Sequence, residues 1–252
     1  MVHFVGAGCG AADLITLRGK NLIGSADVII YAGSLVNPEL LGYAKDSCEI
    51  YNSAEMTLDE VINIIKDAEK CGLTTVRLHT GDPSIYGAVR EQMDKLSKLG
   101  IEYDVCPGVS SFCGAAASLK CEYTLPGVTQ TVILTRMAGR TDVPERESIA
   151  SLAKHRAAMV IFLSVSMSEK LTDELILGGY PPDTPAAVVY KATWDDERVL
   201  RCCLAELPDA VKKSGITKTA LIIVGDQLGN AYELSKLYSP DFETGFRKAE
   251  KR

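Results

Sequence analysis

Short apolar segments alternate with helix-like segments through the first half of this chain, and this alternation constrains its fold more than any other feature. Strand-like runs cover 2–8, 26–33, 74–80 and 101–108, and helix-like stretches lie between and after them at 17–26, 56–72, 84–100 and 110–119. Strands that alternate with helices usually pair in parallel, because each connecting helix crosses one face of the sheet. The pattern therefore predicts an α/β fold with a largely parallel, covered sheet.

Boundary residues support two of these helices. Thr57 and Glu60 have the spacing of a capping box, and Gly72 is placed to end the same helix in the left-handed conformation. In the next helix-like stretch the apolar residues on one helical face are Ile85, Val89, Met93 and Leu96. We therefore expect a helix over the whole of 84–100, with Pro83 at its first position, where a missing N–H costs nothing.

The alternation is interrupted at 120–130, KCEYTLPGVTQ, which we take as the domain boundary. We expect an N-terminal α/β domain over 1–119 and a C-terminal α/β domain over 120–252. In the second half, strand-like runs occur at 131–135, 159–165, 185–193, 198–204 and 220–226, and helix-like stretches at 147–155, 168–179 and 208–215. Several of these strands are nearly consecutive, which favours a mixed sheet in the second domain.

Composition excludes several classes of protein. The formal net charge of −6 and the pI of about 5.2 argue against a nucleic-acid-binding surface. The apolar runs are too short to span a bilayer, and the N-terminus has no signal-peptide pattern, so we expect a cytoplasmic protein that does not enter a membrane. The eight cysteines form no CxxC pair, which favours free thiols in a reducing compartment and no zinc site.

A glycine-rich turn follows the first strand. Gly6, Gly8 and Ala11 fit the relaxed dinucleotide fingerprint, but that site also needs an acidic residue at the end of the second strand. The second strand ends in YAGS, and its only acid, Asp27, lies at its start. We therefore reject a nicotinamide dinucleotide. The glycines either allow a tight turn with close packing, or let another ligand approach the backbone.

Two further loops follow strands of the first half. LHTGDPSIYG at 78–87 places Asp82 after a strand, at the sheet edge where open α/β sheets bind ligands. An alternative role for Asp82 is a helix N-cap. CPGVSS at 106–111 has the same pattern, with Ser110 and Ser111 as candidate ligand-binding or capping hydroxyls.

The second half offers a different set of side chains. Arg136 and Arg140 follow a strand, where they could bind carboxylates in bidentate fashion or lie exposed in solvent. Trp194, the only tryptophan, lies in YKATWDDER and either packs normally or forms the rim over a flat ligand. The three histidines are not clustered, so neither a metal site nor a hydrolytic triad is indicated.

Taken together, these motifs resemble one family across nearly the whole chain. GAGCGAADLIT, YAGSLV, HTGDPSIYGA, PGVSS, LTRMAGRT and ALIIVG are similar to the tetrapyrrole (corrin and porphyrin) methyltransferases. YAGSLVNPELL and TRMAGRTDVPE resemble the branch that methylates carbon 11 of precorrin-4, or of its cobalt form, in cobalamin biosynthesis. The resemblance implies two α/β domains with a ligand cleft between them, a homodimer, and S-adenosyl-L-methionine as methyl donor.

The family pattern also implies positions for the site. The donor contacts implied are Gly81, Asp82, Pro83, Ile85, Tyr86, Ser110, Ser111, Ser164, Ala192, Thr193, Thr219 and Ala220. The tetrapyrrole contacts implied are Gly8 and Gly10, with Arg136 and Arg140 for the carboxylates of the macrocycle. This chain departs from many relatives in reading Gly-Cys-Gly-Ala at 8–11 instead of GPGD, and in having Ser164 where methionine is common.

The implied reaction needs no protein nucleophile, because the conjugated macrocycle supplies an electron-rich carbon, and no catalytic residue is assigned. The enzyme would act by holding donor and acceptor in line. The alternatives are a sister methyltransferase for another ring carbon or for uroporphyrinogen III, a relative that modifies RNA or protein, and a tetrapyrrole carrier without enzymatic activity.

Overall fold

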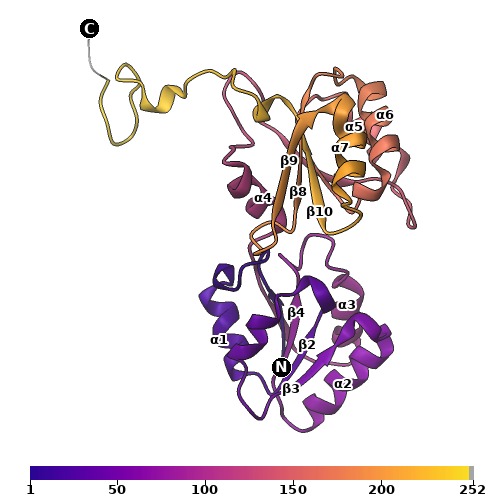
Figure 1. Cartoon of the computed structure of the whole chain (residues 1–252). Coiled ribbons are helices and arrows are strands. Elements are labelled where there is room, and N and C mark those ends of the chain that lie inside the picture. Colours follow the sequence, from indigo (N-terminus) through magenta and orange to yellow (C-terminus); the bar gives the residue numbers. More distant parts are fainter. Residues whose placement is uncertain (250–252) are drawn as a thin grey trace. The chain divides into compact units, whose positions relative to one another are not determined.

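The computed structural model describes residues 1–249, and the chain divides into two compact units (Figure 1). Unit 1 combines Met1–Ser118 with Lys191–Arg198. Unit 2 combines Leu119–Tyr190 with the chain from Val199 onward. A short segment of the second half of the sequence is therefore part of the first unit, which the sequence pattern did not indicate.

Unit 1 is built on a five-stranded sheet in the order β3-β2-β4-β1-β5, and the registered pairs are all parallel. The strands are β1 (Val2–Gly6), β2 (Val28–Tyr31), β3 (Glu49–Asn52), β4 (Thr75–His79) and β5 (Tyr103–Cys106). The helices are α1 (Leu17–Ser25), α2 (Leu58–Lys70), α3 (Arg90–Lys98) and α4 (Ser111–Leu119). The predicted parallel α/β sheet is confirmed.

Both faces of this sheet are covered by helices. Figure 1 shows α2 and α3 on one side of the strands and α1 on the other. On one face Phe4 packs in a core that includes residues of α2 and α3, and on the other Val5 packs with Ile23 of α1. Successive residues of β1 thus enter opposite cores, as expected for a central parallel strand.

The predicted capping box is present at the start of α2. The Thr57 hydroxyl accepts from the Glu60 amide at 3.3 Å, and the Glu60 carboxylate accepts from the Thr57 amide at 2.6 Å. Gly72 follows the helix with φ of +69°, the left-handed conformation expected there.

The prediction of a helix over 84–100 is wrong in its first part. Helix α3 begins only at Arg90, so Pro83 is not its first residue and Ile85 lies outside it. Tyr86 and Ala88 have φ of +54° and +50°, which no right-handed helix accommodates. The spacing of apolar residues could not reveal this, because it carries no information on the sign of φ.

Unit 2 contains a five-stranded sheet in the order β6-β7-β10-β8-β9. Its strands are β6 (Val132–Arg136), β7 (Ala158–Phe162), β8 (Pro185–Tyr190), β9 (Arg198–Cys203) and β10 (Ala220–Val224), and its helices are α5 (Ile149–Ala153), α6 (Ser168–Gly178) and α7 (Leu207–Ser214). Strands β6 and β7 are parallel, whereas β10 runs antiparallel to both β7 and β8. The predicted mixed sheet is confirmed.

One hydrophobic core joins the three helices of unit 2 to its sheet. It includes Leu171 and Leu175 of α6, Val211 of α7, and Ile161 and Ile222 of the central strands. Within residues 1–249, no helix combines the length and apolar character needed to cross a membrane.

Candidate functional site

Three loops at the carboxyl edge of the unit 1 sheet meet through glycine backbone. A Cβ atom on Gly6, at the end of β1, would lie 2.6 Å from the Cα of Gly108 and 2.6 Å from the carbonyl oxygen of Gly81. A Cβ on Gly108 would lie only 2.2 Å from the same oxygen. Only glycine fits at these positions, because any side chain would displace backbone. The sequence showed the three glycines, but not that they pack on one another.

The glycine-rich turn is paired with the loop after β4. The Gly81 amide donates to the Gly8 carbonyl at 2.8 Å, and the Gly8 amide donates to the Gly81 carbonyl at 3.2 Å, which makes an isolated antiparallel bridge. The amide and the carbonyl of Gly8 are therefore both used in hydrogen bonds within the protein. Of the two roles weighed for these glycines, close packing is thus observed directly.

Asp82 ties the loop after β4 to the loop after β5. One carboxylate oxygen accepts from the Gly108 amide at 2.9 Å, and the other accepts from the Ser84 amide at 2.8 Å and from the Ser84 hydroxyl. Burial alone would raise the pKa of Asp82, but the hydrogen bonds from Ser84 and Gly108 outweigh it and leave the pKa below its ordinary value. The N-cap alternative is wrong, since no helix begins here.

The two serines after β5 lie beside this turn. Ser110 is buried, and its Cα is 3.5 Å from where a Cβ on Gly81 would be. The Ser110 carbonyl accepts from the Cys113 amide at 3.0 Å, and Ser111 is the first residue of α4. Donor-site candidates from β4 and β5 are therefore neighbours at one edge of the sheet.

The segment Lys191–Arg198 completes this edge of unit 1. The Thr193 hydroxyl accepts from the Ala11 amide at 3.0 Å and lies 3.5 Å from the Cys9 sulfur. A Cβ on Gly10 would lie 2.4 Å from the Trp194 ring, so the indole packs directly against the glycine-rich turn. Residues about 180 positions apart in sequence thus form one surface of unit 1.

Non-glycine residues with positive φ gather in the candidate loops. Eight such residues occur in the described chain, and six belong to these loops: Tyr86, Ala88, Leu163, Lys191, Thr193 and Thr219. Each conformation of this kind costs about 1–3 kcal/mol and persists only where the surroundings enforce it, most often at functional sites. The strain independently singles out the loops that the motif comparison identified.

In unit 2 the strand register collects the other candidates at one sheet edge. Arg136 pairs with Phe162 across β6 and β7, and Ala220 pairs with Tyr190 across β10 and β8. The carboxyl ends of β6, β7 and β8 therefore lie at the same edge as the amino end of β10. The predicted residues at or next to this edge are Arg136, Ser164, Thr219 and Ala220.

Arg136 organises the loop that follows it. Its guanidinium donates to the carbonyls of Met137 and Thr141, both at 3.1 Å, and of Asp142 at 2.7 Å. Three of the five N–H groups of an arginine are used in this way. Arg140 lies in the same loop and is exposed. The two arginines therefore differ, one shaping the loop and the other presenting its charge to solvent.

The Ser164 hydroxyl is fully buried and forms hydrogen bonds with backbone groups at the same edge of the sheet. It accepts from the Met137 amide at 2.9 Å and donates to the Phe162 carbonyl at 2.7 Å. This joins the end of β6 to the end of β7. A contact between Ser164 and a ligand would have to come from its backbone.

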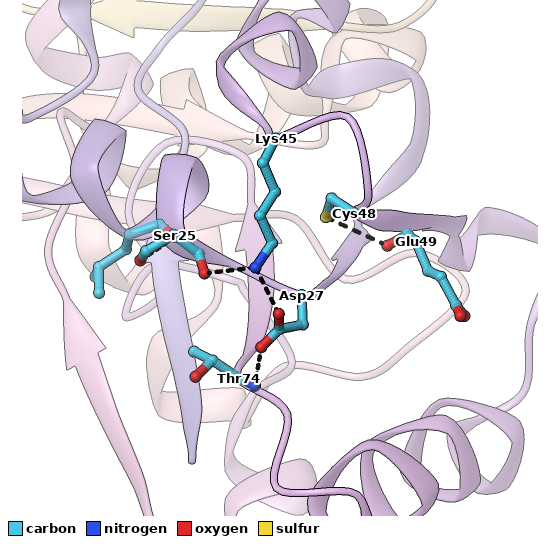
Figure 2. Close-up of polar contacts among 7 residues, drawn as sticks. Ser25, Asp27, Lys45, Cys48, Glu49 and Thr74 are labelled. Carbon is cyan, nitrogen blue, oxygen red and sulfur yellow. Dashed lines mark hydrogen bonds and ion pairs between the residues drawn. The ribbon is translucent and has the colours of Figure 1, made fainter.

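Asp27 is held at the opposite edge of the unit 1 sheet. Its carboxylate accepts from the Lys45 ammonium at 2.5 Å and from the Thr74 amide at 2.8 Å. Figure 2 shows both contacts as dashed lines. The hydrogen bond to Lys45 is the main cause of a lowered Asp27 pKa. Because Asp27 precedes β2, it is not placed to bind a ribose at the carboxyl edge.

The histidines do not build a metal centre. Among residues 1–249, no group of three or more His, Cys, Asp or Glu side chains is arranged to hold an ion. His79, the last residue of β4, is buried, and its Nε2 has no hydrogen-bond partner. Burial, reinforced by the nearby Arg77 charge, lowers the pKa of His79 to about 3, so its imidazole is neutral at physiological pH.

Comparisons with known proteins agree with the motifs. The sequence model of the tetrapyrrole (corrin/porphyrin) methylases matches residues 1–208. The cobalt-precorrin-4 C(11)-methyltransferase of Methanocaldococcus jannaschii is 57% identical over 252 residues, covering 100% of this chain and 97% of the relative. The enzyme of the same name from Priestia megaterium is 43% identical over 254 residues, covering 99% and 98% of the two chains.

Solved structures show the same relationship. The fold matches the X-ray structure of a cobalt precorrin-4 methyltransferase with a TM-score of 0.89 and 44% identity, over 91% of this chain and 96% of that one. It also matches uroporphyrin-III C-methyltransferase from Thermus thermophilus complexed with S-adenosylhomocysteine, with a TM-score of 0.75 and 25% identity, over 90% and 92%. The predicted family is confirmed: this chain belongs to the tetrapyrrole (corrin/porphyrin) methylases.

Proposed function

We propose that this protein transfers a methyl group from S-adenosyl-L-methionine to carbon 11 of cobalt-precorrin-4 in cobalamin biosynthesis. The observation that carries the proposal is the 57% identity, over the full length of the chain, to a relative named for that reaction. The site geometry is compatible with it, since most of the non-glycine residues with positive φ lie in the loops that contain the family's sequence motifs.

The donor is bound, in this proposal, by the loops at the sheet edges. The residues assigned to it are Gly81, Asp82, Pro83, Ile85, Tyr86, Ser110, Ser111, Ala192 and Thr193 of unit 1, and Ser164, Thr219 and Ala220 of unit 2. The residues around β4 and β5 suit such a ligand. Tyr86, 47% exposed, and half-buried Ile85 offer apolar surface for an adenine, beside the Asp82 carboxylate and the backbone of the Gly81 turn.

The tetrapyrrole is assigned to Gly8, Gly10, Arg136 and Arg140. The macrocycle carries several carboxylates, and arginine binds a carboxylate more specifically than lysine because its N–H groups form a planar fork. Arg140 is exposed and can make such a bond directly, whereas Arg136 keeps the loop in the shape that presents Arg140.

The chain's own contribution to the reaction is positioning. When bound, S-adenosylmethionine supplies an electrophilic methyl group on sulfur. The protein residues hold that group in line with the nucleophilic ring carbon. Holding two reactants in this way makes a bimolecular step effectively unimolecular, which accounts for a large part of such rate enhancements. Transfer would form the new carbon–carbon bond as the carbon–sulfur bond breaks, with that electron pair returning to sulfur to give S-adenosylhomocysteine, and the positive charge taken up by the macrocycle would be lost as a proton to solvent.

The proposal includes three properties of the whole protein. The first property is a division into an N-terminal domain over 1–119 and a C-terminal domain over 120–252, with the segment 191–198 added to the N-terminal domain. The protein works as a homodimer, and it works in the cytoplasm. Sedimentation equilibrium of the purified protein tests whether it is a homodimer, and fractionation of cells tests whether it is in the cytoplasm.

The decisive experiment uses donor labelled with ¹³C in its methyl group. The protein is incubated anaerobically with this donor and cobalt-precorrin-4, and the label is located in the product by NMR. Label at carbon 11 supports the proposal, and label at another ring carbon replaces it with a sister activity. Cobalt-free precorrin-4 as a parallel substrate tests the metal preference, and donor binding without any transfer would indicate a carrier.

A further inference from the structure

One carboxylate fixes the segment Lys191–Arg198 within unit 1. A single oxygen of Glu197 accepts from the Thr193 amide at 2.5 Å and from the Ser118 hydroxyl at 2.6 Å. The Glu197 amide in turn donates to the Trp194 carbonyl at 3.0 Å. Glu197 is half-buried, so these bonds are only partly exposed to competition from water.

The residue that Glu197 holds is strained. Thr193 has φ of +68°, a conformation that β-branched residues rarely adopt. Its amide is bound by the Glu197 carboxylate, and a hydrogen bond to an ionised acceptor is roughly twice as strong as a neutral one. The left-handed turn is therefore held by this carboxylate together with the Trp194 amide, which donates to the Lys191 carbonyl at 3.0 Å, and not by any local preference of threonine.

The same turn reaches the glycine-rich loop. In its left-handed conformation Thr193 presents its hydroxyl to the Ala11 amide at 3.0 Å. On its other side, α4 leaves room for this contact, because a Cβ on Gly114 would lie 2.8 Å from the Cys9 sulfur and 3.3 Å from the Thr193 methyl group. Glu197, bonded to Ser118 in the last turn of α4, thus links three segments of unit 1.

We propose that Glu197 is a positioning residue for methyl transfer: its carboxylate holds Thr193 in the left-handed turn that joins the donor loop at 191–194 to the tetrapyrrole loop at 8–11. The proposal rests on the proposed function, because it assigns Thr193 to the donor and Gly8 and Gly10 to the acceptor. Glu197 acts through Thr193 and touches no ligand itself. Without the carboxylate, Thr193 leaves the left-handed conformation, and the loops assigned to the donor and to the tetrapyrrole are no longer held together.

The test compares Glu197→Gln, which keeps the shape and removes the charge, with Glu197→Ala, which removes the acceptor. Asp195→Asn is the matched control, since it removes one negative charge from an exposed residue of the same segment. Each full-length variant is titrated with S-adenosylhomocysteine by calorimetry. Its thermal midpoint and its kcat and KM for cobalt-precorrin-4 are measured in parallel.

We expect Glu197→Gln to weaken S-adenosylhomocysteine binding about tenfold and Glu197→Ala more, with kcat/KM for the tetrapyrrole falling as well. Asp195→Asn should match the native protein. Ser118→Ala should weaken binding less, and should add nothing in a Glu197→Ala background, because both changes remove the same contact. A purely structural role would lower the thermal midpoint while leaving the affinity of the folded protein unchanged.

Native donor affinity and kcat/KM in folded Glu197→Gln would overturn the proposal, as would equal losses in Glu197→Gln and Asp195→Asn. If both Glu197 variants fail to fold, native affinity in Ser118→Ala assigns Glu197 to stability and also overturns it. Failure of the proposed function looks different, since the native protein itself would then bind no S-adenosylhomocysteine.

Discussion

Gly108 and Gly81 approach so closely that a Cβ atom on Gly108 would lie 2.2 Å from the Gly81 carbonyl oxygen. The loop after β5 therefore rests on the loop after β4 without any side chain between them. Asp82 strengthens the same contact by accepting from the Gly108 amide. The shape of the loop after β4, to which we assign the donor, thus depends on backbone packing between two neighbouring strand ends.

Gly108→Ala should destabilise unit 1 and distort this loop. A methyl group there forces the backbone apart, and overpacking of this kind costs about 1–3 kcal/mol or more of unfolding free energy. Denaturant unfolding measures the loss, and calorimetry measures the expected fall in S-adenosylhomocysteine affinity. Gly42→Ala is the control, because a Cβ there meets nothing within 4 Å. Native stability in Gly108→Ala would contradict the close approach.

Asp82→Ala should weaken donor binding and lower stability together. It leaves the Gly108 and Ser84 amides without their acceptor, and each lost hydrogen bond of this kind costs about 1–3 kcal/mol. Asp82→Asn should be milder, since one amide oxygen still accepts. Asp67→Ala, which removes an exposed carboxylate that pairs with Lys70, serves as the control. A folded Asp82→Ala protein with native donor affinity would refute the cofactor role.

Arg140→Ala should raise KM for the tetrapyrrole about tenfold or more and leave S-adenosylhomocysteine affinity unchanged, because an arginine–carboxylate bond contributes about 1.5–3 kcal/mol. Arg140→Lys should restore part of the loss, since the charge remains.

Arg136→Ala should raise the same KM by disordering its loop, and Arg136→Lys should not rescue it, because one ammonium cannot span three carbonyls. Steady-state kinetics at saturating donor separates these outcomes; equal effects on donor and acceptor would disprove the assignment.

His79 should make the protein less stable in acid. Its pKa is about 3 in the folded chain and near 6.5 when unfolded, so between these values only the unfolded chain takes up the proton. The free energy of unfolding then falls as pH falls, by at most about 1.4 kcal/mol per pH unit from this residue. Urea unfolding from pH 7.5 to pH 4.5 should show a shallower pH dependence in His79→Leu. Exposed His155→Gln should keep the native slope, and an unchanged slope in His79→Leu would contradict the prediction.

The family, the parallel sheet and the mixed sheet could be predicted from motifs and local patterns in the sequence, whereas the strand orders and the short strand β3 could not. The capping box at Thr57 and Glu60 and the alternating strand and helix runs fix elements without reference to distant residues. The helix expected from Ser84 onward failed for the opposite reason. Tyr86 and Ala88 have positive φ, which the spacing of apolar residues does not encode, and the Ala88 carbonyl accepts from the Gln92 side chain at 3.0 Å.

By itself, then, the sequence determined the motifs and the parallel and mixed character of the two sheets, and it predicted the loops where ligands should bind. Only the tertiary structure decided which of these loops touch. It brought the Thr193 hydroxyl to the Ala11 amide, packed Gly108 against the Gly81 carbonyl, and brought the Glu197 carboxylate to the Thr193 amide. The physical reason is that glycine contacts and single hydrogen bonds between distant residues leave no periodic trace in a sequence, since each depends on where the chain returns in space.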